Sequence, residues 1–374
     1  MENKIIRCDL IVKEVKDEIK EFVSNLKNNN KRVPSLCIIS VGNDSASESY
    51  IKGKVKDCEY TGINVNVIKY DNMVTESELC KKIDETCKDF SIDGLIVQLP
   101  LPKHINSKEI AKHIKKEYDV DGFTEENTAL LWSKDTVKNK NNSSIMYPCT
   151  PYGISYLLDE IGYSDLSNKK AVIVGRSDIV GKPMIKFLLD KNATVSICHS
   201  KTEEFQLIQE CLSADILICA VGKAKIINRN YIKKNAIVID VGINRDKNGK
   251  LCGDVDLENV LDLVKYITPV PKGIGLLTRA MLLKNVIKSY NSKTIESVSN
   301  ATNLVVDDCR LNKEFSNIFE EDVENTKWIK SVKSDTCSIN TVTNSIDPIN
   351  SRLCKVENKI KDMNKRKNHW GIRR

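Results

Sequence analysis

The chain has 374 residues, 41% of them hydrophobic, which is enough to bury a core and suggests about two domains. Its formal net charge of +7 is concentrated at one end: residues 351–374 carry nine Lys or Arg against two acidic residues, and the remaining chain carries 49 of each sign. The body therefore has no net charge with which to bind a polyanion, so we do not expect nucleic acid as a partner. The partner of the basic tail stays unknown.

Two further features of the composition indicate a cellular compartment. No run of about 18 apolar residues is present, and the start "MENKIIRCDL" lacks the basic-then-apolar pattern of a signal peptide. The 13 Cys are scattered without a CxxC pair, which fits reduced thiols better than disulfides or a metal site. We expect a cytoplasmic protein with no membrane span and no metal.

The first part of the chain alternates between helix and strand patterns. Residues 9–29 place Ile11, Val15, Ile19, Phe22 and Leu26 on one helical face. Buried strands are expected at "SLCIISVG" (35–42), "INVNVIKY" (63–70) and "GLIVQLP" (94–100), with helices between them. This order favours βα units around a parallel sheet. The polar, Asn-rich stretch 133–146 then predicts a loop insertion near a domain boundary.

A second alternating block begins at Pro148. Its expected strands are "KAVIVG", "ATVSICHS", "DILICAVG", "AIVIDVG" and "KYITPV", and a helix over residues 277–290 ends the globular pattern. After Asn291 the apolar periodicity weakens, so we interpret residues 292–374 as a basic, poorly ordered C-terminal extension.

The stretch "VIVGRSDIVGKP" (172–183) indicates a strand, a glycine-bounded turn and a helix start, an arrangement that presents backbone N–H groups to a phosphate. It is not GxGxxG, and an ordinary βα turn with Gly181 as a spacer is the alternative. Where an NAD site usually has an acidic residue after the next strand, this chain has His199, Ser200, Lys201 and Thr202. With Arg176 following Gly175, these donors favour NADP over NAD, unless the segment is only a polar surface turn.

Other stretches place unusual residues beside apolar runs. Tyr50 and Lys54 share a helical face at (i, i+4) spacing, Gln98 closes a strand where α/β sheets bind ligands, and Asp121 precedes a glycine turn. The loop "TPVPKGIG" combines two prolines and two glycines. Each also has a purely structural interpretation: a solvated helix face for Tyr50 and Lys54, and turn caps for Gln98 and Asp121.

Together and in this order, the stretches resemble the bifunctional methylenetetrahydrofolate dehydrogenase/cyclohydrolase family. The residues that carry the resemblance are the Tyr-x-x-x-Lys helix, "DGLIVQLPLP", "DVDGF", "PCTPYG", "VGRSDIVGKP", "TVSICHSKT", "DVGIN", "GDVD" and "TPVP". The resemblance spans about residues 5–290. It implies two α/β domains, the C-terminal one a Rossmann-type parallel sheet, with a folate and NADP cleft between them and usually a homodimer.

The resemblance implies that the enzyme oxidises 5,10-methylenetetrahydrofolate with NADP and hydrolyses the methenyl product to 10-formyltetrahydrofolate. It implies a folate and catalytic domain over residues 1–147, completed by the helix 277–290, and an NADP-binding domain over residues 148–276. The matched positions are listed by role: Tyr50, Lys54, Gln98 and Asp121 for catalysis and folate; Pro269 and Gly273 for folate; and Gly175, Arg176, Ser177, His199, Ser200 and Ile243 for the cofactor.

The chemistry of these side chains agrees with the resemblance. Hydride loss turns the folate into a cation that water must then attack. A carboxylate at that centre would form a tight ion pair, whereas a desolvated lysine, whose pKa burial lowers, can take a proton and return it. The amide of Gln98 can hold the amine of Lys54 without adding charge. Tyr50 offers a flat face to the aminobenzoyl ring, and Asp121 matches the donors of the pterin's aminopyrimidine edge.

The chain departs from the family pattern at a few positions. Lys272 stands where a glycine is usual, which is strained if the backbone there has a positive φ, and Leu276 and Leu277 replace a proline and a methionine. Ala129 also replaces a glycine. Two alternatives remain: a dehydrogenase with weak cyclohydrolase activity, and a catalytically weakened folate-binding protein whose tail binds a partner.

Overall fold

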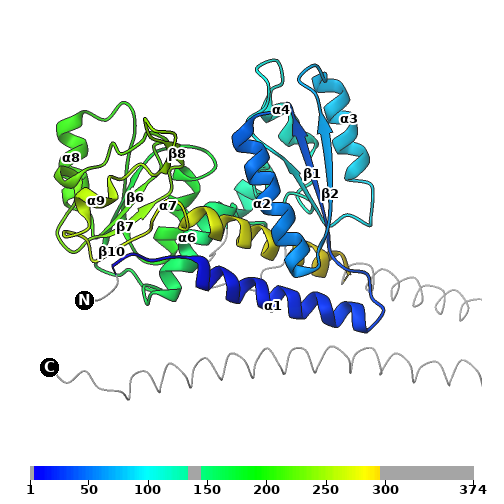
Figure 1. Cartoon of the computed structure of the whole chain (residues 1–374), viewed down its shortest axis with the longest axis horizontal. Coiled ribbons are helices and arrows are strands. Elements are labelled where there is room, and N and C mark those ends of the chain that lie inside the picture. Colours follow the sequence, from blue (N-terminus) through cyan, green and yellow to red (C-terminus); the bar gives the residue numbers. More distant parts are fainter. Residues whose placement is uncertain (1–3, 134–144, 295–374) are drawn as a thin grey trace, which may run out of the picture. The chain divides into compact units, whose positions relative to one another are not determined.

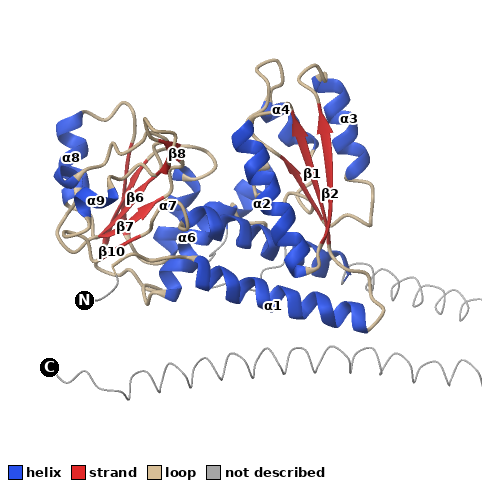
Figure 2. Ribbon diagram, in the orientation of Figure 1, coloured by secondary structure: helices blue, strands red, loops and turns tan. Residues whose placement is uncertain are grey.

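The computed structural model describes residues 4–133 and 145–294. Most of the Asn-rich loop and the tail from residue 295 onward lie outside the described residues, so the interpretations of both stay predictions. Figures 1 and 2 show two parallel sheets with helices packed against each. Both sheets belong to one compact unit, Met1–Ser299.

The first sheet has three parallel strands in the order β2-β1-β3. Its elements and the helices around them are α1 (Asp9–Asn28), β1 (Ser35–Val41), α2 (Ser45–Thr61), β2 (Asn64–Tyr70), α3 (Glu76–Thr86), β3 (Gly94–Val97), α4 (Ser107–His113) and α5 (Glu125–Ser133). A bridge between Leu95 and Asp119 adds one more parallel segment beside β3. The carboxyl ends of β3 and of this segment therefore lie at one edge of the sheet, which brings Gln98 and Asp121 near each other.

The second sheet has five parallel strands in the order β10-β7-β6-β4-β5. Its elements are α6 (Cys149–Glu160), β4 (Lys170–Val174), α7 (Gly181–Asp190), β5 (Thr194–Cys198), α8 (Glu204–Leu212), β6 (Ile216–Cys219), the 3₁₀ turn η1 (Arg229–Tyr231), β7 (Ile237–Asp240), α9 (Leu257–Val260) and β10 (Tyr266–Ile267). The chain runs outward in opposite directions from β4 and β6, so the ligand-binding switch point of this doubly wound order lies between them. An antiparallel pair, β8 (Asn244–Arg245) with β9 (Leu251–Cys252), is not evident from the sequence pattern.

The last described helix spans residues 274–294 and is longer at both ends than the predicted 277–290. It returns to the first sheet's helices and loops: Arg279 pairs with Asp57 of α2, and Lys284 lies 3.7 Å from Glu18 of α1. Figure 1 shows this yellow helix next to α1. The last described helix therefore packs against helices that surround the first sheet.

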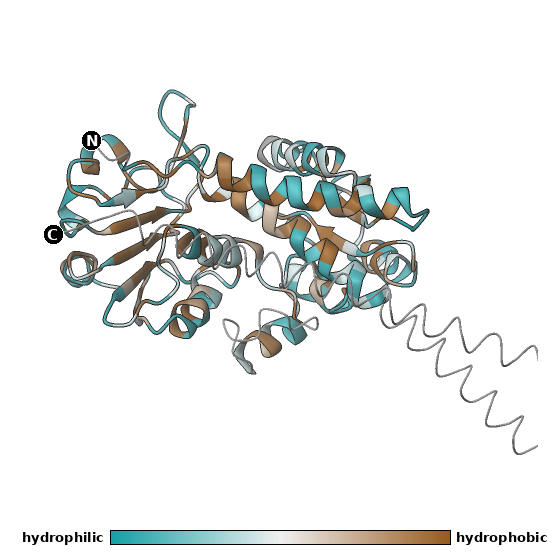
Figure 3. Ribbon diagram, turned by 90° about the horizontal axis from the view of Figure 1, so that it is seen from below, coloured by the Kyte–Doolittle hydropathy of each residue, from teal (hydrophilic) through white to brown (hydrophobic). Residues whose placement is uncertain are grey.

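Helix α1 forms because its apolar residues recur every three to four positions. The helix buries Val12, Val15, Ile19 and Val23. Val15 and Ile19 were predicted for the buried face, whereas Ile11 and Phe22, also predicted, are only partly buried against the core. One core cluster joins α1, β1 and β3 to α6, α7, β4 and the 274–294 helix. Figure 3 shows strands that are largely brown and helices with a brown face and a teal face, as burial of one face requires.

Three expectations about composition concern the described part of the chain. Its helices include none long and apolar enough to cross a membrane. Within residues 4–133 and 145–294, no group of three His, Cys, Asp or Glu side chains could hold a metal ion. The ten cysteines in these ranges are all unpaired and buried.

Candidate active site

Helix α2 presents Tyr50 and Lys54 toward the end of the first sheet. The carboxylate of Asp44 accepts the backbone N–H of Ser47 at 2.8 Å and starts the helix, and Gly62, at φ 79°, ends it. Lys54 is only 5% exposed, whereas Lys56, two residues later, is exposed. The interpretation of Lys54 as a solvated helix lysine is therefore wrong.

Lys54 forms a hydrogen bond with Gln98. The ammonium Nζ donates to Gln98 Oε1 at 3.0 Å, and Gln98 Nε2 donates to the carbonyl of Leu99 at 2.9 Å. Because Leu99 accepts from the NH₂ group, the amide orientation is fixed with its oxygen toward the lysine. The backbone N–H of Gln98 donates to Ile39 at 2.8 Å, which continues the pairing of β3 with β1. The side chain thus lies at the carboxyl end of β3, as the sequence predicts.

Tyr50 lies against the same lysine. Its ring centroid is 5.5 Å from Lys54 Nζ, and its hydroxyl donates to the carbonyl of Gly275 at 3.5 Å. Burial raises the pKa of Tyr50 to about 12, so the phenol is neutral over the physiological range. The tyrosine therefore supplies an uncharged aromatic face between α2 and the loop that precedes the 274–294 helix.

Asp121 completes this group of four residues. Burial raises the pKa of its carboxyl group, and the nearby Lys54 opposes that shift. Cys149, at the start of α6, lies beside this turn: its thiol donates to the carbonyl of Val120, the residue before Asp121, at 3.3 Å. Asp121 thus lies within the electrostatic reach of Lys54 and Tyr50, and the structure brings together the four residues that the sequence singled out.

A cavity of about 730 Å³ lies beside Asp121. It is bounded by the end of β3, by α4 and α5, and by the first turn of α7, and its wall includes Ala129, one of the departures from the family pattern. This volume is in the range of small-molecule sites. Tyr50, Lys54 and Gln98 are not part of its wall, and Gln98 instead lines a small cavity of about 40 Å³ against α2.

The turn after β4 has no room for side chains at its two glycines. A Cβ atom at Gly175, where φ is 132°, would lie 2.2 Å from the carbonyl oxygen of Ala220, and one at Gly181 would lie 2.1 Å from the carbonyl oxygen of Gly175. The turns after β4 and β6 therefore approach each other closely at the switch point. This favours the nucleotide-binding interpretation of the turn over an ordinary βα turn.

Ser177 caps the start of α7. Its hydroxyl oxygen accepts from Val180 N at 3.2 Å and Gly181 N at 3.4 Å, and its carbonyl accepts from Lys182 N at 3.1 Å. Three N–H groups that a phosphate could use are thus already satisfied within the turn. The exposed guanidinium of Arg176 has no hydrogen bond or ion pair with any residue that the structure describes, so it is available to an anionic ligand.

The turn after β5 carries the other predicted cofactor residues. The backbone N–H of His199 donates to Thr202 Oγ1 at 3.0 Å, Thr202 N donates to the carbonyl of His199 at 2.8 Å, and His199 Nδ1 accepts from Lys201 N at 3.2 Å. This arrangement leaves Ser200 exposed at the tip of the turn. Because β5 neighbours β4, Ser200 and Arg176 follow adjacent parallel strands at the same sheet edge.

The loop 269–275 links the two groups of residues. A Cβ atom at Gly273 would lie 2.2 Å from the carbonyl oxygen of Pro269, and one at Gly275 would lie 3.4 Å from Ile243 Cδ1. Ile243 is 54% exposed, so its side chain is open to a ligand beside this loop. Lys272 has φ 77°, which is the condition under which the sequence predicted strain. Leu277 is fully buried.

Three buried polar residues near these groups were not predicted as site residues, although Cys149 and Asp254 lie within the stretches "PCTPYG" and "GDVD" that carry the resemblance. The thiol of Cys149 donates to the carbonyl of Val120, and Asn285 donates to the carbonyls of Val120 and Tyr147. Asp254 accepts the backbone N–H groups of residues 221–223, which follow β6 at the switch point. For Asn285 the signal was a polar residue inside an apolar helical pattern, which does not reveal its partner.

Comparisons with known proteins place these features in a family. Residues 6–121 match the model "Tetrahydrofolate dehydrogenase/cyclohydrolase, catalytic domain", and residues 148–294 match "Tetrahydrofolate dehydrogenase/cyclohydrolase, NAD(P)-binding domain". The chain is 46% identical over 286 residues to the bifunctional protein FolD of Bacillus cytotoxicus, covering 76% of this chain and 96% of that one.

Solved structures agree. The bifunctional enzyme FolD of Campylobacter jejuni is 40% identical, with a TM-score of 0.71 over 77% of this chain and 98% of that chain. A dehydrogenase-cyclohydrolase from Trypanosoma brucei, solved with NADP cofactor and inhibitor, is 30% identical, with a TM-score of 0.72 over 78% of this chain and 98% of that chain. The chain therefore belongs to the tetrahydrofolate dehydrogenase/cyclohydrolase family.

Proposed function

We propose that this protein oxidises 5,10-methylenetetrahydrofolate with NADP and hydrolyses the resulting methenyl cation to 10-formyltetrahydrofolate. The observation that carries the proposal is the buried hydrogen bond between Lys54 and Gln98, beside the ring of Tyr50. Burial and an uncharged hydrogen-bond partner hold the Lys54 nitrogen in a fixed place beside an aromatic ring, where it can exchange a proton with a bound substrate. Membership of the family and the likeness to bifunctional relatives support both activities.

The residues at the switch point fit NADP. When bound, NADP supplies the hydride acceptor for the oxidation. Gly175 and Gly181 let the turns after β4 and β6 approach each other closely at the switch point, and Arg176 and Ser200 offer a cation and a hydroxyl at the sheet edge where a ribose phosphate would lie. With no carboxylate at the end of β5, the site favours NADP over NAD.

The folate would be oriented by the group around Lys54. We assign the aminobenzoyl ring to the face of Tyr50, because its neutral phenol avoids placing charge against an apolar ring. We assign the aminopyrimidine edge of the pterin to Asp121, whose two oxygens match its paired donors. Pro269 and Gly273 would shape the loop that covers the substrate on the side of Tyr50.

Lys54 would handle the proton in the hydrolysis. The attacking water must lose a proton as it adds to the cationic carbon, and the Lys54 amine lies in a site that excludes bulk water. Gln98 accepts a hydrogen bond from the amine and adds no charge, so it orients the nitrogen without pairing with the cationic substrate. The oxidation depends mainly on the relative position of folate and cofactor. Lys54 is therefore needed for proton transfer in the hydrolysis and less in the oxidation.

The test is to compare Lys54→Met with Lys56→Met. We expect Lys54→Met to lower the cyclohydrolase rate by about 100-fold or more, the usual contribution of a general acid-base group, and to lower the dehydrogenase rate less. Methenyltetrahydrofolate should therefore accumulate. Lys56 is exposed on another side of the same helix, so its replacement should be silent. Both steps are followed by absorbance at one pH; equal losses of hydrolysis in the two variants would contradict the role of Lys54.

The domain limits, location and assembly are part of the same proposal. We assign folate binding and catalysis to residues 1–147, completed by the last described helix, and cofactor binding to residues 148–276. The ten unpaired cysteines suit a reducing compartment, which supports a cytoplasmic location. We propose a homodimer, which sedimentation at micromolar concentration would test.

A further inference from the structure

The turn that carries Asp121 is held from within by Asp119. Asp119 is 2% exposed, and its Oδ1 accepts from the backbone N–H groups of Gly122 and Phe123 at 2.9 and 3.1 Å. Its Oδ2 accepts from Thr124 N at 2.8 Å and from Asn127 Nδ2 at 2.9 Å. Four donors on one carboxylate make residues 119–124 a stiff unit, but none of them ties this unit to the rest of the site.

Asn285 supplies that connection from the 274–294 helix. Its Nδ2 donates to the carbonyl of Val120 at 2.7 Å and to the carbonyl of Tyr147 at 2.8 Å, and the residue is 1% exposed. An amide NH₂ has two donor hydrogens, so both are used. Val120 directly precedes Asp121, and Tyr147 precedes α6. Asn285 therefore joins the Asp121 turn, the crossing to the second sheet and the last helix at one point.

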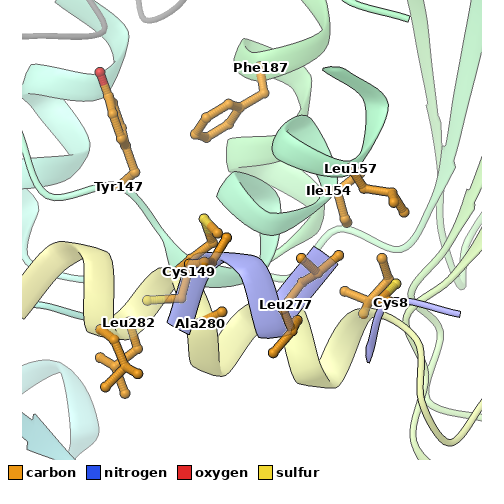
Figure 4. Close-up of a cluster of buried hydrophobic side chains, with 14 of the residues drawn as sticks. Cys8, Tyr147, Cys149, Ile154, Leu157, Phe187, Leu277, Ala280 and Leu282 are labelled. Carbon is orange, nitrogen blue, oxygen red and sulfur yellow. The ribbon is translucent and has the colours of Figure 1, made fainter. Parts of the chain in front are cut away.

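The backbone around this point leaves little room for adjustment. A Cβ atom at Gly122, where φ is 72°, would lie within 2.8 Å of backbone atoms of Met146, Tyr147 and Pro148. Cys149, whose thiol donates to the carbonyl of Val120 at 3.3 Å, lies 3.6 Å from Asn285 Nδ2. Figure 4 shows Tyr147 and Cys149 beside the helix that carries Ala280 and Leu282. The position of Asp121 is thus set by a close backbone contact that Asn285 holds together.

We propose that Asn285 is a positioning residue, which fixes the carboxylate of Asp121 for the donor edge of the substrate's aminopyrimidine ring. The proposal rests on the proposed role of Asp121 in folate binding. Without Asn285, the buried carbonyl of Tyr147 loses its amide donor and that of Val120 keeps only the weak thiol donor of Cys149 at 3.3 Å, so the two segments separate to reach water or other partners. That movement displaces Asp121 but leaves Lys54, Gln98 and the cofactor turn on their own elements.

The same helix provides a matched control. Ser289 lies one turn after Asn285, is also 1% exposed, and its hydroxyl lies 2.6 Å from the carbonyl of Asp93 and 2.7 Å from that of Glu117. It therefore makes the same kind of contact to two backbone segments of the same sheet. Neither carbonyl adjoins a residue of the proposed site. Ser289→Ala measures what the loss of such a contact does to the fold alone.

The experiment compares Asn285→Ala, Ser289→Ala, Asp121→Asn and the double variant Asn285→Ala/Asp121→Asn in the full chain. The dehydrogenase KM for 5,10-methylenetetrahydrofolate and for NADP, the dissociation constant for tetrahydrofolate by calorimetry, and the melting temperature are measured. We expect Asn285→Ala to weaken folate binding about tenfold by both measures and to change the KM for NADP less than about twofold. Both alanine variants should lose stability, but Ser289→Ala should keep wild-type folate binding.

The double variant separates positioning from a general structural effect. If Asn285 acts through Asp121, adding Asn285→Ala to Asp121→Asn weakens folate binding no further. The proposal would be overturned if the double variant loses folate binding by the product of the two single effects. It would also be overturned if Asn285→Ala and Ser289→Ala weaken folate binding equally. Unchanged folate binding in Asp121→Asn would instead overturn the assignment of Asp121 in the proposed function, and this inference with it. If Asn285→Ala does not fold, Asn285→Ser is used instead. The serine hydroxyl is shorter than the amide and has one donor hydrogen, so it cannot satisfy both carbonyls. Wild-type folate binding by a folded Asn285→Ser variant would overturn the proposal.

Discussion

Replacing Lys272 with glycine should stabilise the protein. Lys272 has φ 77°, a left-handed conformation in which the Cβ of an L-residue crowds the following carbonyl. Relief of that crowding should raise the free energy of unfolding by about 1–2 kcal/mol. Glycine has more conformational freedom in the unfolded chain, which lowers the free energy of unfolding by about 0.4–1 kcal/mol, so the net gain should be about 0.5–1 kcal/mol. The side chain is exposed, and its backbone carbonyl, which accepts from Cys8 N at 3.0 Å, is retained.

The assay is urea unfolding of wild type, Lys272→Gly and Lys272→Ala. The three proteins are compared on condition that the free energy of unfolding falls with urea concentration at the same slope in each. The alanine variant keeps a Cβ atom and so keeps the strain, while it removes the rest of the lysine. We expect its free energy of unfolding to stay within about 0.5 kcal/mol of the wild-type value. If Lys272→Gly is no more stable than Lys272→Ala, backbone strain at this position is not stored in the native state and the reasoning fails.

Three further predictions concern the cofactor, the tail and pH. Arg176→Ala should raise the KM for NADP about tenfold, the value of one charge-assisted contact, with little change for NAD; a wild-type preference for NAD would contradict this. Deletion of residues 295–374 should leave both activities within about threefold, since every matched residue precedes it; insoluble protein would show otherwise. Burial lowers the pKa of Lys288 from 10.5 to about 8, so the folded state releases this proton first; urea unfolding should therefore show the wild type gaining stability relative to Lys288→Met as the pH rises between those values.

Much of the fold can be predicted from the sequence because its strands are short apolar runs bounded by glycine, proline and polar turn residues. The alternation of strand and helix predicted both parallel sheets, since parallel neighbours need a crossover and the chain supplies a segment long enough for one in each gap, a helix in most of them and the 3₁₀ turn η1 between β6 and β7. The start of the last helix was placed three residues late. Two glycines at 273 and 275 suggested a rigid loop, but Ile274 is buried in the core, and its packing overrides the low helix propensity around it.

The site was predictable where a residue's role depends on its own element. Gln98 ends a strand and Lys54 lies one turn after Tyr50, so their positions follow from strand direction and helical spacing. Asn285 was not predictable in this way. Its partners, Val120 and Tyr147, are backbone carbonyls more than 130 positions away, and a carbonyl leaves no trace in the identity of the residue that carries it. Such contacts are visible only once the chain is folded.

The loop 269–275 borders both the proposed folate site and the proposed cofactor site. Gly275 accepts from the hydroxyl of Tyr50 at 3.5 Å, and a Cβ atom in its place would touch Ile243 at 3.4 Å. The same residue thus borders the aromatic face assigned to folate and the side chain assigned to the cofactor. Hydride transfer needs the two ligands within about 3.5 Å of each other, so a loop that touches both sites can set their separation. The 274–294 helix, which begins within this loop, carries Asn285 near its middle, so a single helix borders both proposed ligand sites at its first turn and holds the backbone next to Asp121 three turns later.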